Sequence, residues 1–192
     1  MNESLKNSPE SGQDATAVDT RCVSCRTPKT TTECEVCFEP LCKKCVLTLS
    51  PDRFSLMLGA PEVFQKYRFC QPCYDSLIAP EAERYDETVE RAKQVIFLTD
   101  TYKGYLPVQK KAKLSVSVKG CVDRDEVVMR LAFMAAQQGF NSLIKSDVKA
   151  IKIRKDAAYQ TSEWQGHGTP ADVDESRLVQ DEIREEVWRR GK

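Results

Sequence analysis

The spacing of apolar residues changes twice along this chain of 192 residues. After Pro80 they recur at helical spacing, which predicts a helix over 79–94. From residue 95 the pattern becomes that of strands, with Val95–Leu98 apolar and strict alternation over 114–118. The region 95–173 therefore starts with two predicted strands.

A second helix is predicted inside this region. Asp123 and Glu126 form a capping box, and an apolar helical face follows until Gly139, a residue suited to the left-handed end of a helix. Two more strands are expected over 143–153 and 159–164, followed by a turn at Gly166-His167-Gly168. The expected order over 95–173 is strand, strand, helix, strand, strand.

The two ends of the chain differ from this pattern. Residues 1–20 are polar and contain few large apolar side chains, so we expect a disordered tail. In the last segment, 174–192, Val179, Ile183 and Val187 lie four residues apart, which predicts a C-terminal amphipathic helix.

Cysteine chemistry dominates the remaining segment, 21–78. Eight thiols in four pairs match the ligand count of two closed four-cysteine zinc sites. A disulfide module would need an export signal, and residues 1–20 contain no apolar run that could act as one. We expect two structural zinc ions per chain, held by the Cys-x-x-Cys pairs Cys22/Cys25, Cys34/Cys37, Cys42/Cys45 and Cys70/Cys73.

Charge and apolar content limit the partners. The 29 basic and 29 acidic side chains cancel, which argues against a general nucleic-acid binder. Basic residues exceed acidic ones over 107–155, where a solvated sheet face is the expected reason. No apolar run approaches the ~20 residues that span a bilayer, and abundant reduced thiols indicate a cytoplasmic protein.

The gaps between the cysteine pairs are eight, four and twenty-four residues. With the segments CEVCFEPLCKKC (34–45) and YRFCQPCYDSL (67–77), this spacing resembles FYVE and FYVE-related zinc fingers. The resemblance implies a treble-clef cross-brace, in which Cys22, Cys25, Cys42 and Cys45 hold one ion and Cys34, Cys37, Cys70 and Cys73 the other. Sequential pairing is the alternative that the sequence leaves open.

The resemblance fails where FYVE domains bind phosphatidylinositol 3-phosphate. Members that bind this lipid carry basic residues around the third cysteine, whereas this chain has Thr30–Glu33 before Cys34 and Glu35 after it. Carboxylates repel phosphate. We therefore expect a protein-binding finger, with its docking surface on the apolar insertion 52–67.

Three segments of the second region, VIFLTDTYKGY (95–105), AAQQGFNSLI (135–144) and GHGTPADV (166–173), resemble the YbjQ-like family of heavy-metal-binding proteins. That resemblance implies a dodecin-like β/α domain that forms closed rings through its sheet edges. Cys121 and His167, the ninth thiol and the single histidine, could bind a metal together or act as a nucleophile pair. A buried strand end and an exposed turn are the simpler roles.

Together these patterns predict an α+β protein with a two-zinc finger at 21–78 and a small β/α domain at 95–173. The expected function is that of a non-enzymatic interaction scaffold, homo-oligomeric through the C-terminal domain, with a protein partner that the sequence does not name. A phosphoinositide-binding FYVE adaptor and a RING-like ubiquitin ligase are the alternatives.

Overall fold

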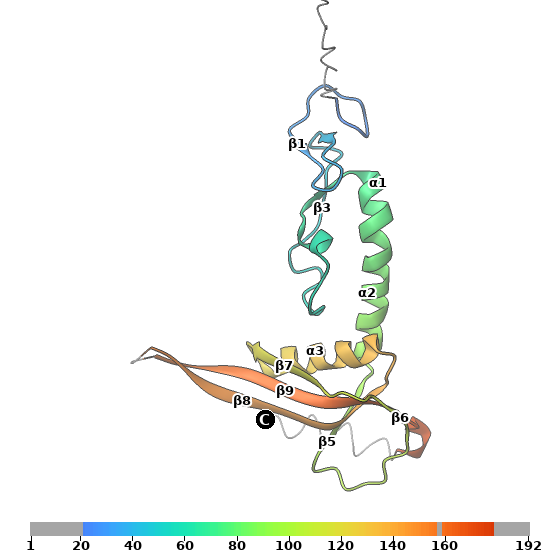
Figure 1. Ribbon diagram of the computed structural model, residues 1–192, viewed down its shortest axis with the longest axis vertical. Helices are drawn as coiled ribbons and strands as arrows, with labels where there is room; N and C mark the ends of the chain where they lie inside the picture. Colours follow the sequence, from blue (N-terminus) through green and yellow to red (C-terminus); the bar gives the residue numbers. More distant parts are fainter. Residues whose placement is uncertain (1–20, 157–158, 179–192) are drawn as a thin grey trace, which may run out of the picture.

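The computed structural model describes residues 21–156 and 159–178. The predicted tail at 1–20 and all but the start of the predicted helix at 174–192 lie outside the described residues. Figure 1 shows the short strands β1 and β3 toward one end, a long helix and a sheet at the opposite end. The architecture is α+β, as the sequence predicts.

The finger, residues 21–78, consists of very short elements. Two strand pairs are antiparallel, and a single 3₁₀ turn lies in the loop between the strands of the second pair. These elements are β1 (Thr32–Glu33), β2 (Pro40–Leu41), β3 (Leu47–Thr48), η1 (Glu62–Gln65) and β4 (Arg68–Phe69). Strands of two residues cannot support a domain on their own, so other interactions must hold the finger together.

One helical rod leads from the finger to the sheet. It begins as α1 (Gln71–Cys73), passes through the π-helical segment η2 (Tyr74–Ile78) and continues as α2 (Ala79–Ala92) without leaving helical backbone angles. The helix predicted over 79–94 is α2. Its buried side chains are Tyr85, Thr88 and Ala92.

The C-terminal domain, residues 95–173, contains one five-stranded sheet and one helix. Its elements are β5 (Ile96–Thr99), β6 (Val108–Lys111), β7 (Val116–Cys121), α3 (Arg124–Gln137), β8 (Ser142–Asp156) and β9 (Tyr159–Val173). The short 3₁₀ turn η3 (Glu175–Arg177) follows. Strand β8 pairs in parallel with β5 and antiparallel with β9, and β9 also pairs with β6 and β7.

Strand β6 was not predicted, because the residues VQKK carry no apolar alternation and the strand forms by pairing with β9. Helix α3 agrees with its prediction. The Asp123 carboxylate accepts a hydrogen bond from the backbone N–H of Glu126 at 2.8 Å, and Gly139 after the helix has a φ of +80°.

The turn predicted at Gly166-His167-Gly168 is wrong, because these residues lie inside β9. α3 packs directly on this strand, and a Cβ on Gly166 would lie 2.6 Å from Val127 Cγ1. The glycines therefore allow a helix to pack closely on a strand. Close approach of another segment is, besides turns, a common reason for glycine within a strand.

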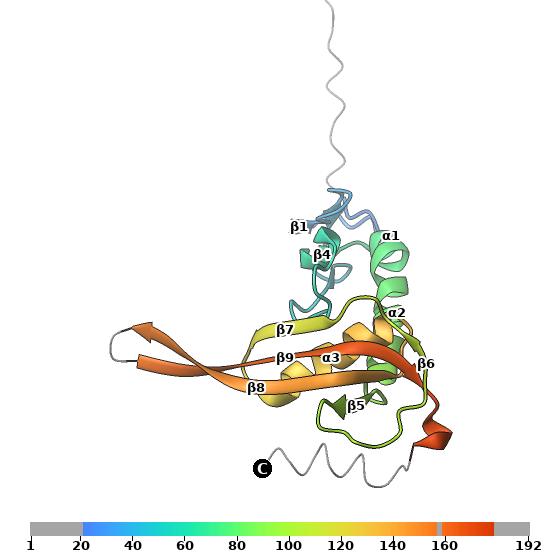
Figure 2. The ribbon, with the colours of Figure 1, turned by 60° about the horizontal axis from the view of Figure 1, so that its bottom comes forward.

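Strands β8 and β9 extend well beyond the other strands as a two-stranded ribbon (Figure 2). The last pair with β5 is Thr99↔Ser146 and the last with β7 is Cys121↔Trp164, whereas β8 and β9 stay paired out to Asp156↔Tyr159. Both outer edges of this ribbon lack a partner strand among the described residues. Such ribbons are marginally stable in water when nothing covers them.

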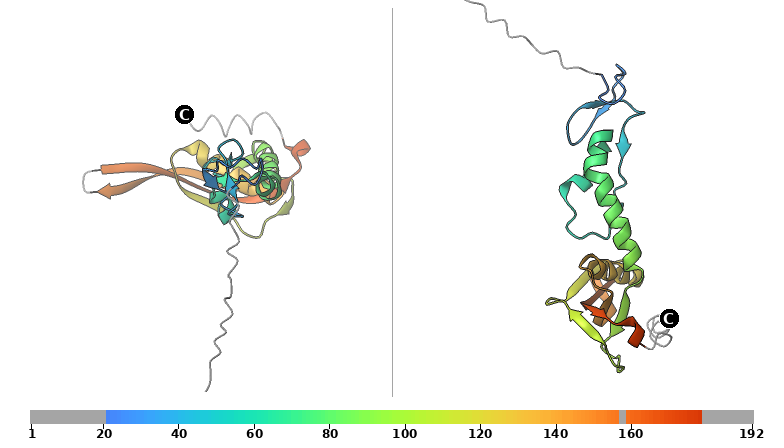
Figure 3. Two further views of the ribbon diagram at one scale, coloured as in Figure 1. Left: turned by 90° about the horizontal axis from the view of Figure 1, so that it is seen from above. Right: turned by 90° about the vertical axis from the view of Figure 1, so that its right-hand side faces the viewer.

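A single apolar core joins the finger to the C-terminal domain. It includes Phe54 and Phe64 of the finger insertion, Tyr85 of α2 and Phe133 of α3. α3 lies between α2 and the sheet (Figure 3, right). The insertion predicted as a docking surface is therefore largely a packing surface, although Leu58 within it is 53 % exposed.

Candidate metal centre

The eight predicted cysteine ligands form two groups of four. Within each group every pair of sulfur atoms lies within 4.8 Å. One group contains Cys22, Cys25, Cys42 and Cys45, and the other contains Cys34, Cys37, Cys70 and Cys73. The pairing is thus interleaved along the chain, and each group could hold a metal ion.

The sulfur separations fit a tetrahedral ion. Cys25 Sγ lies 3.6 Å from Cys42 Sγ, and Cys37 Sγ lies 3.7 Å from Cys70 Sγ. Four sulfurs at the zinc–sulfur distance of about 2.3 Å define a tetrahedron with edges of about 3.8 Å. The two groups therefore match a four-thiolate site in size, and all eight cysteines are free thiols in the structure.

Thiol acidity within each group also fits a cation. Burial opposes ionisation of Cys22, but backbone N–H groups of Cys25, Cys42 and Ser24 lower its pKa to about 6. In the same group the neighbouring sulfurs of Cys25 and Cys42 raise the pKa of Cys45 to about 12. Four clustered thiols cannot all ionise next to one another unless a positive ion neutralises them.

The second group follows the same rule. Burial again opposes ionisation of Cys34, yet backbone N–H groups of Cys37, Cys70 and Val36 lower its pKa to about 7. Burial and then the nearby sulfurs of Cys70, Cys37 and Cys34 raise the pKa of Cys73. In each group one thiol has a lowered pKa and another a raised pKa, as expected for neighbouring thiols that oppose one another's ionisation.

Two cysteine pairs are followed by a residue with left-handed backbone. Arg26 after Cys25 has a φ of 59°, and Phe38 after Cys37 has a φ of 61°. Their N–H groups donate to the carbonyl oxygens of Cys22 and Cys34 at 2.8 and 2.9 Å, which closes each pair into a tight turn. Glycine is the usual residue in this conformation, so both positions carry strain.

Glu35 has a structural contact that the sequence did not reveal. Its carboxylate accepts hydrogen bonds from the backbone N–H of Tyr67 at 2.9 Å and from Arg68 Nε at 2.8 Å. These contacts lower the pKa of Glu35, the Tyr67 N–H most strongly. Arg68 Nη1 also donates to Thr32 Oγ1. The Glu35 carboxylate thus ties the second cysteine pair to β4.

Cys121 and His167 do not form a site. Cys121 is 1 % exposed in the core at the end of β7, where burial raises its pKa. His167 is exposed on β9, paired with Ser117 and Asp147. Cys121 is paired with Trp164, three residues from His167, so the two side chains lie on opposite faces of the sheet. The predictions that Cys121 and His167 bind a metal together or act as a nucleophile pair are therefore wrong within one chain.

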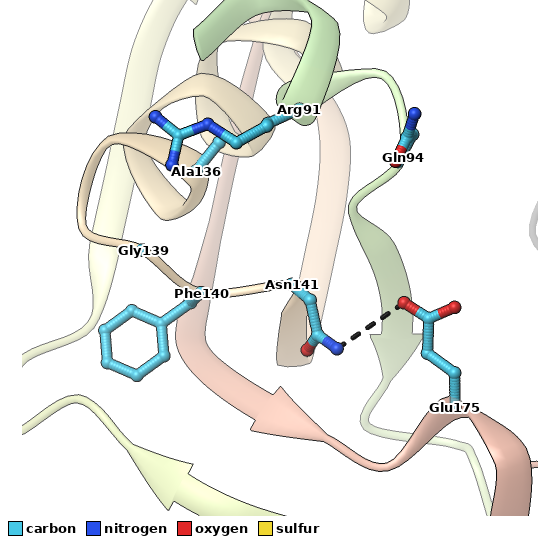
Figure 4. A pocket seen from close by; sticks show the side chains of 7 residues that line it. All are labelled: Arg91, Gln94, Ala136, Gly139, Phe140, Asn141 and Glu175. Carbon is cyan, nitrogen blue, oxygen red and sulfur yellow. Dashed lines mark hydrogen bonds between the residues drawn. The ribbon is translucent and has the colours of Figure 1, made fainter. Parts of the chain in front are cut away.

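A small pocket lies where the C-terminal ends of α2 and α3 meet (Figure 4). It has a volume of about 170 Å³ and is lined by Arg91, Gln94, Ala136, Gly139, Phe140, Asn141 and Glu175. The Asn141 amide is used structurally, because it exchanges two hydrogen bonds with the backbone of Val173. Its third contact, from Nδ2 to Glu175 Oε1, is 3.5 Å long.

Comparisons of the chain with protein-family models, curated proteins and solved structures found no match. Neither the FYVE nor the YbjQ resemblance is thereby confirmed, and the two four-cysteine groups are the part of the prediction that the structure supports. None of the described helices is long and apolar enough to span a membrane.

Proposed function

We propose that the chain is a zinc-binding, non-enzymatic scaffold whose finger holds two structural Zn²⁺ ions and whose C-terminal domain self-associates. The observation that carries this proposal is the pair of compact four-sulfur groups. Tetrahedral sites with four thiolates are typical of zinc and of iron–sulfur centres. Zinc is preferred because such closed sites in short cross-braced modules usually supply folding energy.

Bound zinc would supply a fixed tetrahedral node and no reaction site, since four thiolates leave no coordination position open. The protein's own residues connect the two sites. β3 and β4 connect a ligand of one group, Cys45, to a ligand of the other, Cys70. A reducing compartment such as the cytoplasm would keep these ligands as thiolates.

Self-association is supported by the free edges of the C-terminal sheet. The outer edge of β7 has no partner strand among the described residues. The residues flanking this strand, Leu114 and Val122, are 80 % and 83 % exposed. Long edges flanked by exposed apolar residues are templates for strand addition.

The ribbon of a second copy is the partner we assign to this edge. The outer edges of the ribbon formed by β8 and β9 also lack a partner strand among the described residues, so the ribbon of one copy could add to β7 of the next. Such a head-to-tail contact gives a ring if the rotation closes.

Two alternative functions can be tested separately. A phosphoinositide adaptor should bind vesicles containing phosphatidylinositol 3-phosphate, but Glu33 and Glu35 stand where cations are needed and Arg68 is engaged by Glu35. A RING-like ligase should stimulate discharge of ubiquitin from a conjugating enzyme. The scaffold proposal expects neither activity.

The deciding experiment measures metal content and mass on the same purified protein. We expect two zinc ions per chain by elemental analysis and a defined oligomer by light scattering. Ile151→Glu on the ribbon should reduce the oligomer to a monomer and retain both zinc ions. Protein without bound metal would refute the finger proposal, and a monomeric wild type would refute self-association.

A further inference from the structure

A continuous line of aromatic rings joins the finger to α3. Phe54 and Phe64 stack with ring centroids 4.4 Å apart, and Phe54 meets Tyr85 edge-on at 5.1 Å. Tyr85 in turn lies 5.1 Å from Phe133. All four side chains are at most 7 % exposed, so each ring depends on its neighbours for cover.

Both sides of this line are anchored at cysteine ligands. The insertion carrying Phe54 and Phe64 leaves the finger through β3 and β4, and these strands adjoin Cys45 and Cys70. The helix carrying Tyr85 starts at Cys70 and includes Cys73 in its first turn. The second cysteine group therefore fixes the position of the insertion relative to the helix.

Polar contacts hold the insertion on α2 as well. Arg53 donates to Asp86 at 2.6 Å, and its guanidinium lies 5.6 Å from the centroid of the Phe54 ring and 5.5 Å from that of Tyr85. The Leu56 N–H points at the Tyr85 hydroxyl at 3.4 Å. Because this contact is long, the rings and Arg53 account for most of the attachment.

Other apolar residues of the finger also pack with the insertion, because Leu49, Phe69 and Ile78 are buried in the same core as Phe54 and Phe64. The residues packed around its cysteines form a separate small cluster whose buried members are Leu41 and four of the thiols. Without the ions, β3 and β4 would be held by two residue pairs, by the Glu35 contacts with Tyr67 and Arg68 and by the apolar residues beside them, and a strand pair of this length is marginally stable in water. Phe54 and Phe64 would then leave Tyr85 and Phe133 exposed.

The opposite side of α3 does not depend on the finger. Val127 and Leu131 pack against β9 at Gly166, and Leu143 lies beside Gly168. All three side chains are fully buried. Loss of the finger should therefore loosen α2 and the outer side of α3 while the sheet stays folded.

We propose that the metal state of the finger controls the order of α2 and of the α3 side that faces it, through Phe54, Phe64, Tyr85 and Phe133. This inference rests on the proposed zinc binding and adds its regulation. Metal loss would expose an apolar surface on the C-terminal domain without unfolding its sheet. The coupling links the zinc content of the finger to the domain proposed to self-associate.

Hydrogen exchange of the full-length protein tests the coupling. We compare zinc-loaded protein with protein stripped by a chelator, and confirm the zinc content of both. Amides of 85–92 and 131–137 should exchange at least about tenfold faster after stripping, whereas amides of β9 over 164–171 should change little. Re-addition of zinc should restore the slow rates.

A matched pair of variants distinguishes the effect of losing one aromatic ring from the effect of a general loss of stability. Phe54→Ala should retain two zinc ions and already show fast exchange over 131–137, with little further change on stripping. Leu58→Ala, an exposed position of the same insertion, should behave as wild type. If Phe54→Ala does not fold, Phe133→Leu supplies the same test from the α3 side.

The outcomes separate the two proposals. Absence of zinc in the wild type would overturn the proposed function and this coupling together. Two bound zinc ions with unchanged exchange over 131–137 after stripping would overturn the coupling alone. Equal loss of protection throughout the sheet would also overturn it, because the response would then be global unfolding.

Discussion

The finger and the C-terminal domain are stabilised by different means although they share one apolar core. In the finger, thiols make up most of the buried cluster around the cysteines, and strands have two residues each. In the C-terminal domain, the side chains of Val127, Leu131 and Leu143 are fully buried between α3 and the sheet. Stability should therefore depend on metal in one region and on packing in the other.

Loss of a cysteine ligand should have the largest effect. Cys70→Ser removes one ligand of the second group, and metal binding in such modules is worth on the order of 10 kcal/mol per site. We expect the finger to unfold and the zinc content to fall below two ions per chain, measured by elemental analysis and circular dichroism.

Cys121→Ala is the matched control, because Cys121 is buried outside both groups. It should cost about 1 kcal/mol through lost packing and retain both ions. If Cys121→Ala lost zinc as readily as Cys70→Ser, the contrast between the regions would be wrong.

Overpacking should act on the C-terminal domain alone. Gly166→Ala places a methyl group 2.6 Å from Val127 Cγ1 and 3.0 Å from the Asp147 carbonyl oxygen, which should cost about 1–3 kcal/mol. Thermal unfolding should occur at lower temperature with two zinc ions still bound.

Gly168→Ala should be milder, since its nearest contact, Leu143 Cδ2, is 3.1 Å away and belongs to a side chain. The opposite ranking of the two variants would show that α3 does not pack on β9 as described.

Arg53 joins the two regions and should have an intermediate effect. Arg53→Ala removes its contacts with both aromatic rings and should lower the free energy of unfolding by about 1 kcal/mol. Urea unfolding of the zinc-loaded protein measures this. Arg53→Lys, which keeps the charge but not the planar group, should recover part of the loss.

The partner of Arg53 supplies a pH dependence. The hydrogen bond and the positive charge of Arg53 lower the pKa of Asp86 below the ordinary value of 3.8. The pair therefore stabilises the protein above that value, and the contribution disappears as the pH falls through the lowered pKa. Asp86→Asn should be slightly less stable than wild type at neutral pH, and a difference that grew on acidification would contradict this sign.

The smallest expected effect is a gain. Phe38 has a φ of 61° and is 69 % exposed, so Phe38→Gly relieves backbone strain and loses little packing. The relief of about 1–2 kcal/mol is partly offset by the greater freedom of glycine in the unfolded chain. Zinc affinity measured by chelator competition should rise slightly, whereas Phe38→Ala, which keeps the strain, should not change it.

The sequence predicted the finger's ligands better than the topology of the sheet. The two cysteines of each pair are separated by only two residues, so their closeness in sequence also places their thiols close together in the folded chain. Glycine at 166 and 168 has two common uses, in turns and at close contacts, and only the position of α3 distinguishes them. Strand β6 depends on β9, 60 residues away in sequence, and its own residues give no signal.

The insertion shows the same limit. Phe54 and Phe64 are apolar residues in a loop, and Phe54 contacts Tyr85 on a helix whose packing partners the sequence did not indicate. The contact of Glu35 with Arg68 was likewise missed, because a strand pairing far along the chain creates it. Long-range contacts of this kind leave no periodic trace in a single sequence.

The bulge in β8 sets which face of the ribbon each later β8 side chain occupies. Between Ile144↔Thr169 and Asp147↔His167 strand β8 contains one residue more than β9, and Lys145 within it has a φ of 52°. Because side chains alternate from face to face along a strand, deleting Lys145 would turn Ile151 and Ile153 to the side now held by Ala150 and Lys152. The number of residues in this one bulge therefore decides which β8 side chains, apolar or charged, lie on each face of the ribbon.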